Sequence, residues 1–225
     1  MTNRERILKI TADDKNKRIE KILSCIHKNY TLQTARPDDV RFPTSEGIVN
    51  IIIPAKKQKN KIAIVAHHDV FPGSKGYNDN STGVVTLLKL QDVVPENVEL
   101  VFTDGEERGG QGCRYYLENY PNPTEAINVD VVGLGDRVFY EAYGDVTAFD
   151  IPKSLELYAN IPFSDSRVLA DYGVPNILVL TGKSKETLIR NIFEAQHGGR
   201  NDHNLSLISE EMMNTVFDAV VQMIQ

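Results

Sequence analysis

Three short and almost uninterrupted apolar segments constrain the fold of this chain more than any other feature. They span residues 61–66, 98–102 and 126–130, and such runs are typical of strands that are buried on both faces of a sheet. Helical patterns follow the first two segments, at 84–90 and 113–118. Strands that alternate with helices predict an α/β layered fold with a largely parallel central sheet.

The remaining predicted elements extend this α/β pattern along the whole chain. Apolar side chains at helical spacing predict a helix over residues 14–29. Further extended runs are predicted at 32–41, 47–53, 137–143 and 176–180. Ser209 is predicted to cap a last helix, whose apolar stripe comprises Met213, Val216, Phe217, Val220, Val221 and Ile224. No repeat, low-complexity tract or linker interrupts the 225 residues, so residues 1–225 are predicted to form one domain.

Composition and charge exclude several classes of partner. The chain has 25 Lys and Arg against 31 Asp and Glu, so a basic surface for nucleic acid is not expected. No apolar run approaches the roughly 18 residues that a membrane span needs. The charged start, residues 1–6, predicts a helix and not an apolar signal segment. Cys25 and Cys113 have no CxxC spacing and are interpreted as reduced thiols. Together these features predict a cytoplasmic protein.

Residues that carry chemistry cluster where the predicted strands end. The first apolar run ends in His67-His68-Asp69, the second in Asp104-Gly105-Glu106-Glu107, and the third at Asp130. Asn78-Asp79-Asn80-Ser81 stands immediately before a predicted helix. In open α/β sheets, ligands bind beyond the carboxyl ends of the strands. Imidazole and carboxylate groups gathered there suit a divalent metal such as zinc, because carboxylates without a cation would repel one another.

Each of these segments also has a purely structural interpretation when it is taken alone. Asn78-Asp79-Asn80 is a common turn and N-cap sequence. Glu106 and Glu107 suit the first turn of a helix, and Asp130 suits the cap of a turn. The joint occurrence of all the segments at strand ends, in this order, favours the metal site.

Taken in order, the segments resemble the di-zinc aminopeptidases of the bacterial leucyl aminopeptidase type. The matching segments are His67-His68-Asp69, Gly76-Tyr-Asn-Asp79-Asn-Ser-Thr-Gly83, Asp104-Gly-Glu-Glu107, Asn128-Val-Asp130-Val-Val-Gly133, and Ser164-Asp165 ahead of Gly173-Val-Pro175. Together with the apolar run that precedes His67 and the late segment that ends at Ser209, they extend from about residue 61 to 209, most of the chain. The resemblance implies the zinc-exopeptidase fold, a three-layer α/β/α architecture with a mostly parallel, mixed central sheet. Only eleven residues separate His67 from Asp79, which leaves no room there for the lid insertion of related tetrameric enzymes.

The resemblance also implies two Zn²⁺ ions per chain, with Co²⁺ or Mn²⁺ as alternative metals. His67 and Asp130 would bind one ion, and Asp79 would bridge both. Glu107 and a late histidine would bind the second ion. The two ions, about 3.5–4 Å apart, would activate a water molecule that hydrolyses the N-terminal peptide bond of short peptides.

Two further residues receive roles from the resemblance. Glu106 would be the general base that takes a proton from the attacking water. Asp69 would orient His67 by accepting the N–H of its other ring nitrogen. Members of the resembled family carry a cis peptide bond after the bridging aspartate, so the bond between Asp79 and Asn80 is predicted to be cis.

The late histidine is the point at which the sequence departs from the family pattern. His197 with Asp202 fits the family order after a one-residue insertion, whereas His203 lacks an acid in the corresponding place. His197 is therefore the preferred fifth ligand. Well-known members place a tyrosine before this histidine, near the substrate carbonyl, but Gln196 occupies that position here. The group that stabilises the oxyanion is thus not specified, nor is the oligomeric state.

Two alternatives to the aminopeptidase follow from the same resemblance. The first is a glutaminyl cyclase, a transferase on the same fold that keeps a single zinc, although the intact His67 and Asp69 pair disfavours it. The second is a catalytically silent family member that acts as a binding protein. Metal content separates the three hypotheses, because they predict two, one and no zinc ions per chain.

Overall fold

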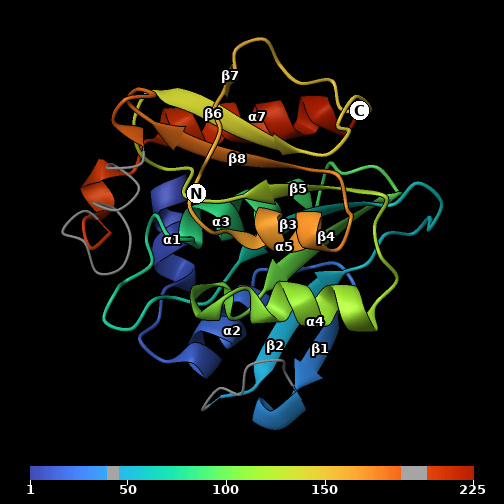
Figure 1. The fold of residues 1–225 in the computed structure, drawn as a ribbon. Helices are drawn as coiled ribbons and strands as arrows, with labels where there is room; N and C mark the ends of the chain where they lie inside the picture. The colour runs from blue at the N-terminus through green and yellow to red at the C-terminus, as the bar shows by residue number, and fades with distance from the viewer. Residues whose placement is uncertain (40–45, 189–201) are drawn as a thin grey trace.

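A mixed sheet of eight strands runs through the centre of the protein (Figure 1). The structure is a computed structural model that describes residues 1–39, 46–188 and 202–225. Its strands are β1 (Thr31–Ala35), β2 (Ile48–Ile53), β3 (Ile62–His67), β4 (Val98–Thr103), β5 (Glu125–Val129), β6 (Arg137–Tyr143), β7 (Glu156–Leu157) and β8 (Asn176–Gly182). They are ordered β1-β2-β4-β3-β5-β8-β6-β7. The four central strands β4, β3, β5 and β8 pair in parallel, whereas β2 and β6 are antiparallel to β4 and β8.

Helices cover both faces of this sheet. The described helices are α1 (Asn3–Ile10), α2 (Lys15–Leu23), α3 (Ser81–Leu90), α4 (Gln111–Asn119), α5 (Asp165–Asp171) and α7 (Glu210–Met223). Helices α1, α3 and α7 pack together on one face, with α2 against α1, and α4 and α5 lie on the other face (Figure 1). This is the predicted three-layer α/β/α architecture. Among the described helices, none has both the length and the apolar character that a membrane span requires.

The central strands are buried on both sides, which explains their uninterrupted apolar sequence. Along β3, Ile64 and Ala66 pack into the larger core with α1, α3 and α7, whereas Ala63 and Val65 pack into the core beneath α4 and α5. Successive side chains of a strand point to opposite faces. A strand between two helical layers therefore needs apolar residues at every position.

The first long predicted helix is shorter than its sequence pattern indicates. Helix α2 ends at Leu23 and not near residue 29. The side chain of Gln91, which follows α3, accepts the N–H of His27 at 3.1 Å and donates to the carbonyl of Cys25 at 3.1 Å. Backbone groups after Leu23 thus find partners in another element instead of in a continued helix. The last helix begins as predicted, with Ser209 accepting the N–H of Met212.

The order of the strands brings the predicted site residues together. From β3 the chain crosses through α3 to β4 on one side, and then through α4 to β5 on the other side of β3. The carboxyl ends of these three parallel strands consequently meet at one edge of the sheet, at the point where the strand order reverses. This is the edge where α/β folds bind their ligands.

Candidate metal centre

The imidazole of His67, at the end of β3, lies between two groups of carboxylates. Its Nε2 atom is 3.0 Å from Asp79 Oδ1 and 3.4 Å from Asp130 Oδ1. These three residues offer ligand atoms within 4.8 Å of one another, and so do His67, Glu106 and Glu107. The structure therefore brings together five of the predicted site residues around one buried histidine.

Several ligand atoms of this cluster are buried without a hydrogen-bond partner among the described residues. They include both ring nitrogens of His67, Asp130 Oδ1 and Glu107 Oε1. A buried polar atom without a partner is costly, and bound cations would satisfy the carboxylate oxygens and Nε2 of His67, whose Nδ1 atom faces Asp69. Imidazole nitrogen and carboxylate oxygen are ligands that Zn²⁺ prefers. The residues present thus fit a metal site.

The proton affinities of the cluster support this interpretation. Burial raises the pKa of Glu106 well above its usual range and that of Glu107 to about 8. Burial acts to lower the pKa of His67, but the carboxylate of Asp130 and its neighbours outweigh it, so this pKa is raised well above its usual value. Without a cation the cluster retains protons, and a metal ion would displace them on binding.

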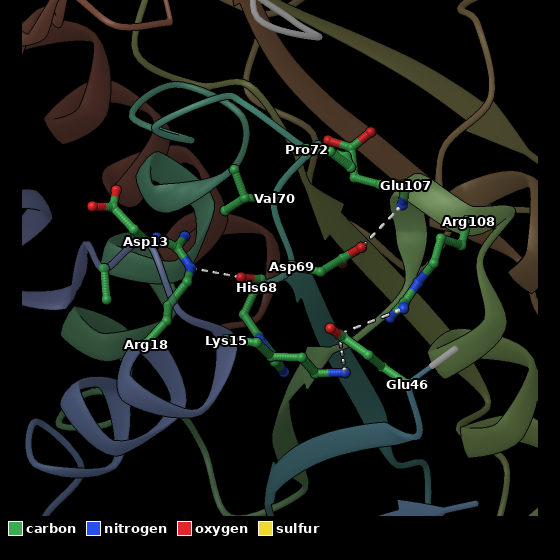
Figure 2. Close-up of a pocket in the computed structure, with 11 residues that line it drawn as sticks. Asp13, Lys15, Arg18, Glu46, His68, Asp69, Val70, Pro72, Glu107 and Arg108 are labelled. Carbon is green, nitrogen blue, oxygen red and sulfur yellow. Dashed lines mark hydrogen bonds and ion pairs between the residues drawn. The ribbon is translucent and has the colours of Figure 1, made fainter. Parts of the chain in front are cut away.

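Asp69 connects the end of β3 to the residues that follow β4. Its carboxylate accepts the backbone N–H of Glu106 at 3.1 Å. It also accepts the backbone N–H of Glu107 at 3.2 Å (Figure 2). Its Oδ1 atom also lies 3.4 Å from Nδ1 of His67. Burial acts to raise the pKa of Asp69, but His67 and these N–H groups outweigh it and lower the pKa to about 2. Asp69 is thus an ionised group placed to orient both His67 and the glutamate pair.

Two asparagines fasten the loop that carries Asp79 to the segment after β5. Asn78 Oδ1 accepts the N–H of Gly133 at 2.9 Å, and Asn80 Nδ2 donates to the carbonyl of Val129 at 2.9 Å. These contacts place Asp79 beside the residue that follows β5. The peptide bond between Asp79 and Asn80 is cis, which confirms the prediction from the resemblance.

The structural interpretation of the Asn-Asp-Asn segment is also correct in part. Asn80 is the N-cap of α3, because its Oδ1 atom accepts the N–H of Gly83 at 2.9 Å. A Cβ atom on Gly83 would lie 2.4 Å from the carbonyl oxygen of Val129, so the close approach of α3 to β5 requires glycine. The turn formed by Asn78, Asp79 and Asn80 thus both caps α3 and places Asp79 in the site.

Asp202 anchors the same loop from the far end of the chain. Its fully buried carboxylate accepts the N–H groups of Gly76 at 2.9 Å, Asn78 at 2.7 Å and Asp79 at 3.2 Å. The hydroxyl of Ser74 also donates to it. The sequence indicated Asp202 only as the acid that follows His197, without a role in positioning Asp79.

Arg18 of α2 is a positioning residue that the sequence analysis missed. It is only 3% exposed. Its Nε atom donates to the carbonyl of His68 at 2.6 Å, and its Nη2 atom donates to Ser81 Oγ at 2.9 Å. It therefore joins the end of β3 to the start of α3. The only signal in the sequence is a charged residue directly beside the apolar stripe of α2.

Asp165, in the first turn of α5, also faces the cluster. Its Oδ2 atom accepts the hydroxyl of Thr103 at 2.6 Å. Its Oδ1 atom is buried without a hydrogen-bond partner in the described ranges. Burial raises the pKa of Asp165 to about 7, with the negative charges of Asp69 and Asp130 acting in the same direction. The resemblance included Asp165 in a matching segment and assigned no role to it.

Of the two late histidines, only His203 lies within the described residues. His197, the preferred fifth ligand, lies outside the described residues, as does Gln196. His203 is described, is exposed, and is absent from the metal-ligand groups of the described residues.

We expect His197→Ala to lower bound zinc toward one ion per chain, because the variant removes a ligand of one ion only. His203→Ala is the matched control and should keep two ions. Atomic absorption on the purified variants measures both outcomes. The reverse result would transfer the ligand role to His203 and leave the other ligands in place.

Comparison with known proteins agrees with this α/β/α fold. Residues 48–177, more than half of the chain, match the model of Peptidase family M28. The chain belongs to this family, which confirms the resemblance found in the sequence. It is 27% identical over 155 residues to Aminopeptidase YwaD of Bacillus subtilis (strain 168), covering 64% of this chain and 32% of that protein. The chain thus spans about a third of the length of this curated relative.

Solved structures share the fold. A zinc aminopeptidase from Bacillus subtilis, BSAP, superimposes with a TM-score of 0.64 at 20% identity, over 79% of this chain and 49% of that chain. A glutaminyl cyclase from Bacteroides thetaiotaomicron, bound to N-acetylhistamine, superimposes with a TM-score of 0.70 at 19% identity, over 99% of this chain and 94% of that chain. These likenesses establish the architecture that aminopeptidases and cyclases have in common.

Proposed function

We propose that this protein is a metal-dependent aminopeptidase that hydrolyses the N-terminal peptide bond of short peptides with two Zn²⁺ ions. The observation that carries the proposal is the buried His67 between two carboxylate groups, with ligand atoms that have no other partner among the described residues. Membership of a peptidase family and similarity to a protein named as an aminopeptidase support it.

Each predicted ligand has a defined place in this proposal. His67 and Asp130 would hold one ion, Asp79 would bridge both, and Glu107 with His197 would hold the other. Bound zinc would supply positive charge that polarises the scissile carbonyl and acidifies the attacking water. Asp69 keeps the His67 ring in a fixed orientation, so that the ligand nitrogen points toward Asp79 and Asp130.

Glu106 is the proposed general base. It is buried, and its backbone N–H is held by Asp69, which fixes the point from which its side chain extends. A carboxylate beside the attacking water can accept its proton and pass it to the leaving amine. The acidic cluster also suits the α-ammonium group of a peptide substrate.

A screen of aminoacyl-coumarin substrates with Zn²⁺, Co²⁺ and Mn²⁺ tests the proposal. We expect coumarin release only from substrates with a free α-amino group, with the N-acetylated substrates as controls. His67→Ala should lose both bound metal and activity. A protein that binds two ions per chain and releases coumarin from none of the substrates would contradict the aminopeptidase.

A glutaminyl-cyclase-like transferase is the second candidate. This chain covers 94% of the length of a solved cyclase and also 94% of a solved leucine aminopeptidase precursor from the same organism, so chain length supports both candidates equally. The resemblance associates cyclases with one zinc ion, so metal content and product separate the candidates. On a peptide with N-terminal glutamine, an aminopeptidase releases the amino acid, whereas a cyclase releases ammonia. A protein with neither metal nor product would be the silent binding protein.

A further inference from the structure

A pocket of about 340 Å³ opens directly beside the candidate metal centre (Figure 2). Asp69 and Glu107 line it on the side of the centre, and its cationic lining residues are Lys15, Arg18 and Arg108. Its volume is at the lower end of the range for small-molecule sites. A substrate held at the metal centre would therefore extend into this pocket, because Glu107 and Asp69 belong to both.

The cations of the pocket differ in how firmly they are already paired. Lys15 Nζ lies 2.6 Å from Asp104 Oδ2 and donates to the carbonyl of Gly47 at 2.7 Å. Arg108 is held more loosely, since its Nη2 atom is 3.4 Å from Asp104 Oδ1 and its Nη1 atom is 3.9 Å from Glu46 Oε2. A guanidinium group has five N–H donors, so Arg108 retains donors for a ligand.

Arg18 supplies a second, independent indication of a ligand. It is 3% exposed, and its Nη1 atom is buried without a hydrogen-bond partner among the described residues. Its other two nitrogens are committed to His68 and Ser81. A buried cationic donor that lines a pocket and lacks a partner is a place where an acceptor is expected.

The acidic residues that line the pocket do not occupy the free N–H donors of Arg18 and Arg108. Asp13 is paired with Lys75 at 2.6 Å. Glu46 lies 4.0 Å from Lys15 Nζ as well as near Arg108. Asp69 is committed to His67 and to the N–H groups that follow β4, and Glu107 is a proposed metal ligand.

We propose that this pocket holds the residue on the carboxyl side of the scissile bond, and that Arg108 and Arg18 bind a carboxylate of that residue. The proposal rests on the proposed aminopeptidase function and adds a substrate class to it. The N-terminal residue is a poorer occupant, because the unsatisfied N–H donors of Arg18 and Arg108 cannot bind its α-ammonium group. A dipeptide carries its two charges at the required ends, with the ammonium group toward the acidic cluster and the carboxylate toward the pocket.

The test compares leucylglycine with leucylglycine amide on the metal-loaded enzyme. We expect kcat/KM to be about tenfold higher for the free acid, the effect of one hydrogen bond to a charged group. Arg108→Gln should reduce this preference to about twofold. The matched control is Arg137→Gln, which removes a surface arginine on β6 that is outside the pocket and should keep the preference. Leucylaspartic acid amide against leucylasparagine amide shows whether a side-chain carboxylate serves equally well.

The outcomes separate this proposal from the proposed function. Equal kcat/KM for acid and amide would overturn the carboxylate pocket and leave the aminopeptidase intact. If no peptide is cleaved, the aminopeptidase fails, and calorimetric binding of D-leucylglycine and its amide to the zinc-loaded protein decides on the pocket. Equal affinities there would overturn it. If Arg108→Gln does not fold, the preference of the unmodified enzyme must still fall as salt is raised, and a salt-independent preference would count against the proposal.

Discussion

Glu106→Gln should lower kcat for peptide hydrolysis by about 10²–10⁴-fold, which is the usual contribution of a positioned general base, and it should leave the metal content unchanged. Glutamine keeps the size of the side chain but cannot accept the proton. The backbone N–H of Glu106 remains bound to Asp69 in the variant, because this contact does not involve the substituted group. KM should change little if the substrate is held by the metals. Steady-state kinetics and atomic absorption on one preparation measure both parts.

Glu107→Gln should behave differently, although the two residues are adjacent. Its Oε1 atom is one of the buried ligand atoms without a partner in the described part of the chain. We therefore expect this variant to lose the second metal first, and activity as a consequence. Glu20→Gln, an exposed position on α2, is the matched control and should change neither quantity. A fully active Glu106→Gln enzyme with two metals would show that the base is another residue.

The strand-end motifs could be located from the sequence because two local signals coincide there. An apolar run identifies a buried strand, and in the parallel strands β3, β4 and β5 the residues that follow the run lie at the carboxyl edge of the sheet. His67, Asp130 and the Glu106–Glu107 pair are all placed in this way. The cis bond after Asp79 was likewise accessible, but only through the resemblance.

The residues that hold the motifs in place could not be predicted in the same way. Arg18 binds groups 50 and 63 positions further along the chain, and no periodicity or motif encodes such distant partners. The direction of β2 and β6 also depends on how these strands dock at the sheet, because successive side chains point to opposite faces in either direction. The end of α2 was not predicted, because the side chain of Gln91, which follows α3, binds backbone groups of Cys25 and His27 after α2.

Asp202 is the clearest example of such a distant contact, because its three backbone donors lie 123 to 126 positions away in the sequence. Its single carboxylate satisfies the N–H groups of Gly76, Asn78 and Asp79, and thereby sets the position of a carboxylate that is proposed to bridge two ions. Removing Asp202 takes this acceptor from the N–H groups of Asn78 and Asp79, whereas the N–H of Gly76 keeps Ser74 Oγ at 3.0 Å. Each unsatisfied buried donor costs about 1–3 kcal/mol. Asp202 should therefore influence both the stability of the protein and the affinity of the metal centre.

We expect Asp202→Asn to lower the free energy of unfolding of the metal-free protein by about 1–3 kcal/mol, because an amide can accept through one oxygen only and turns an NH₂ group toward the remaining donors. Zinc affinity of the folded variant should fall by about 10–100-fold, as is typical when a group that orients a ligand is changed. Urea unfolding in a chelator and zinc titration against a competing chelator measure the two effects separately. Asp218→Asn makes the same change at an exposed position of α7 and should alter neither. If the Asp202→Asn protein folds and binds zinc as tightly as the unmodified protein, the role of Asp202 is restricted to stability. The position of Asp79 would then be set by Asn78 and Asn80 alone.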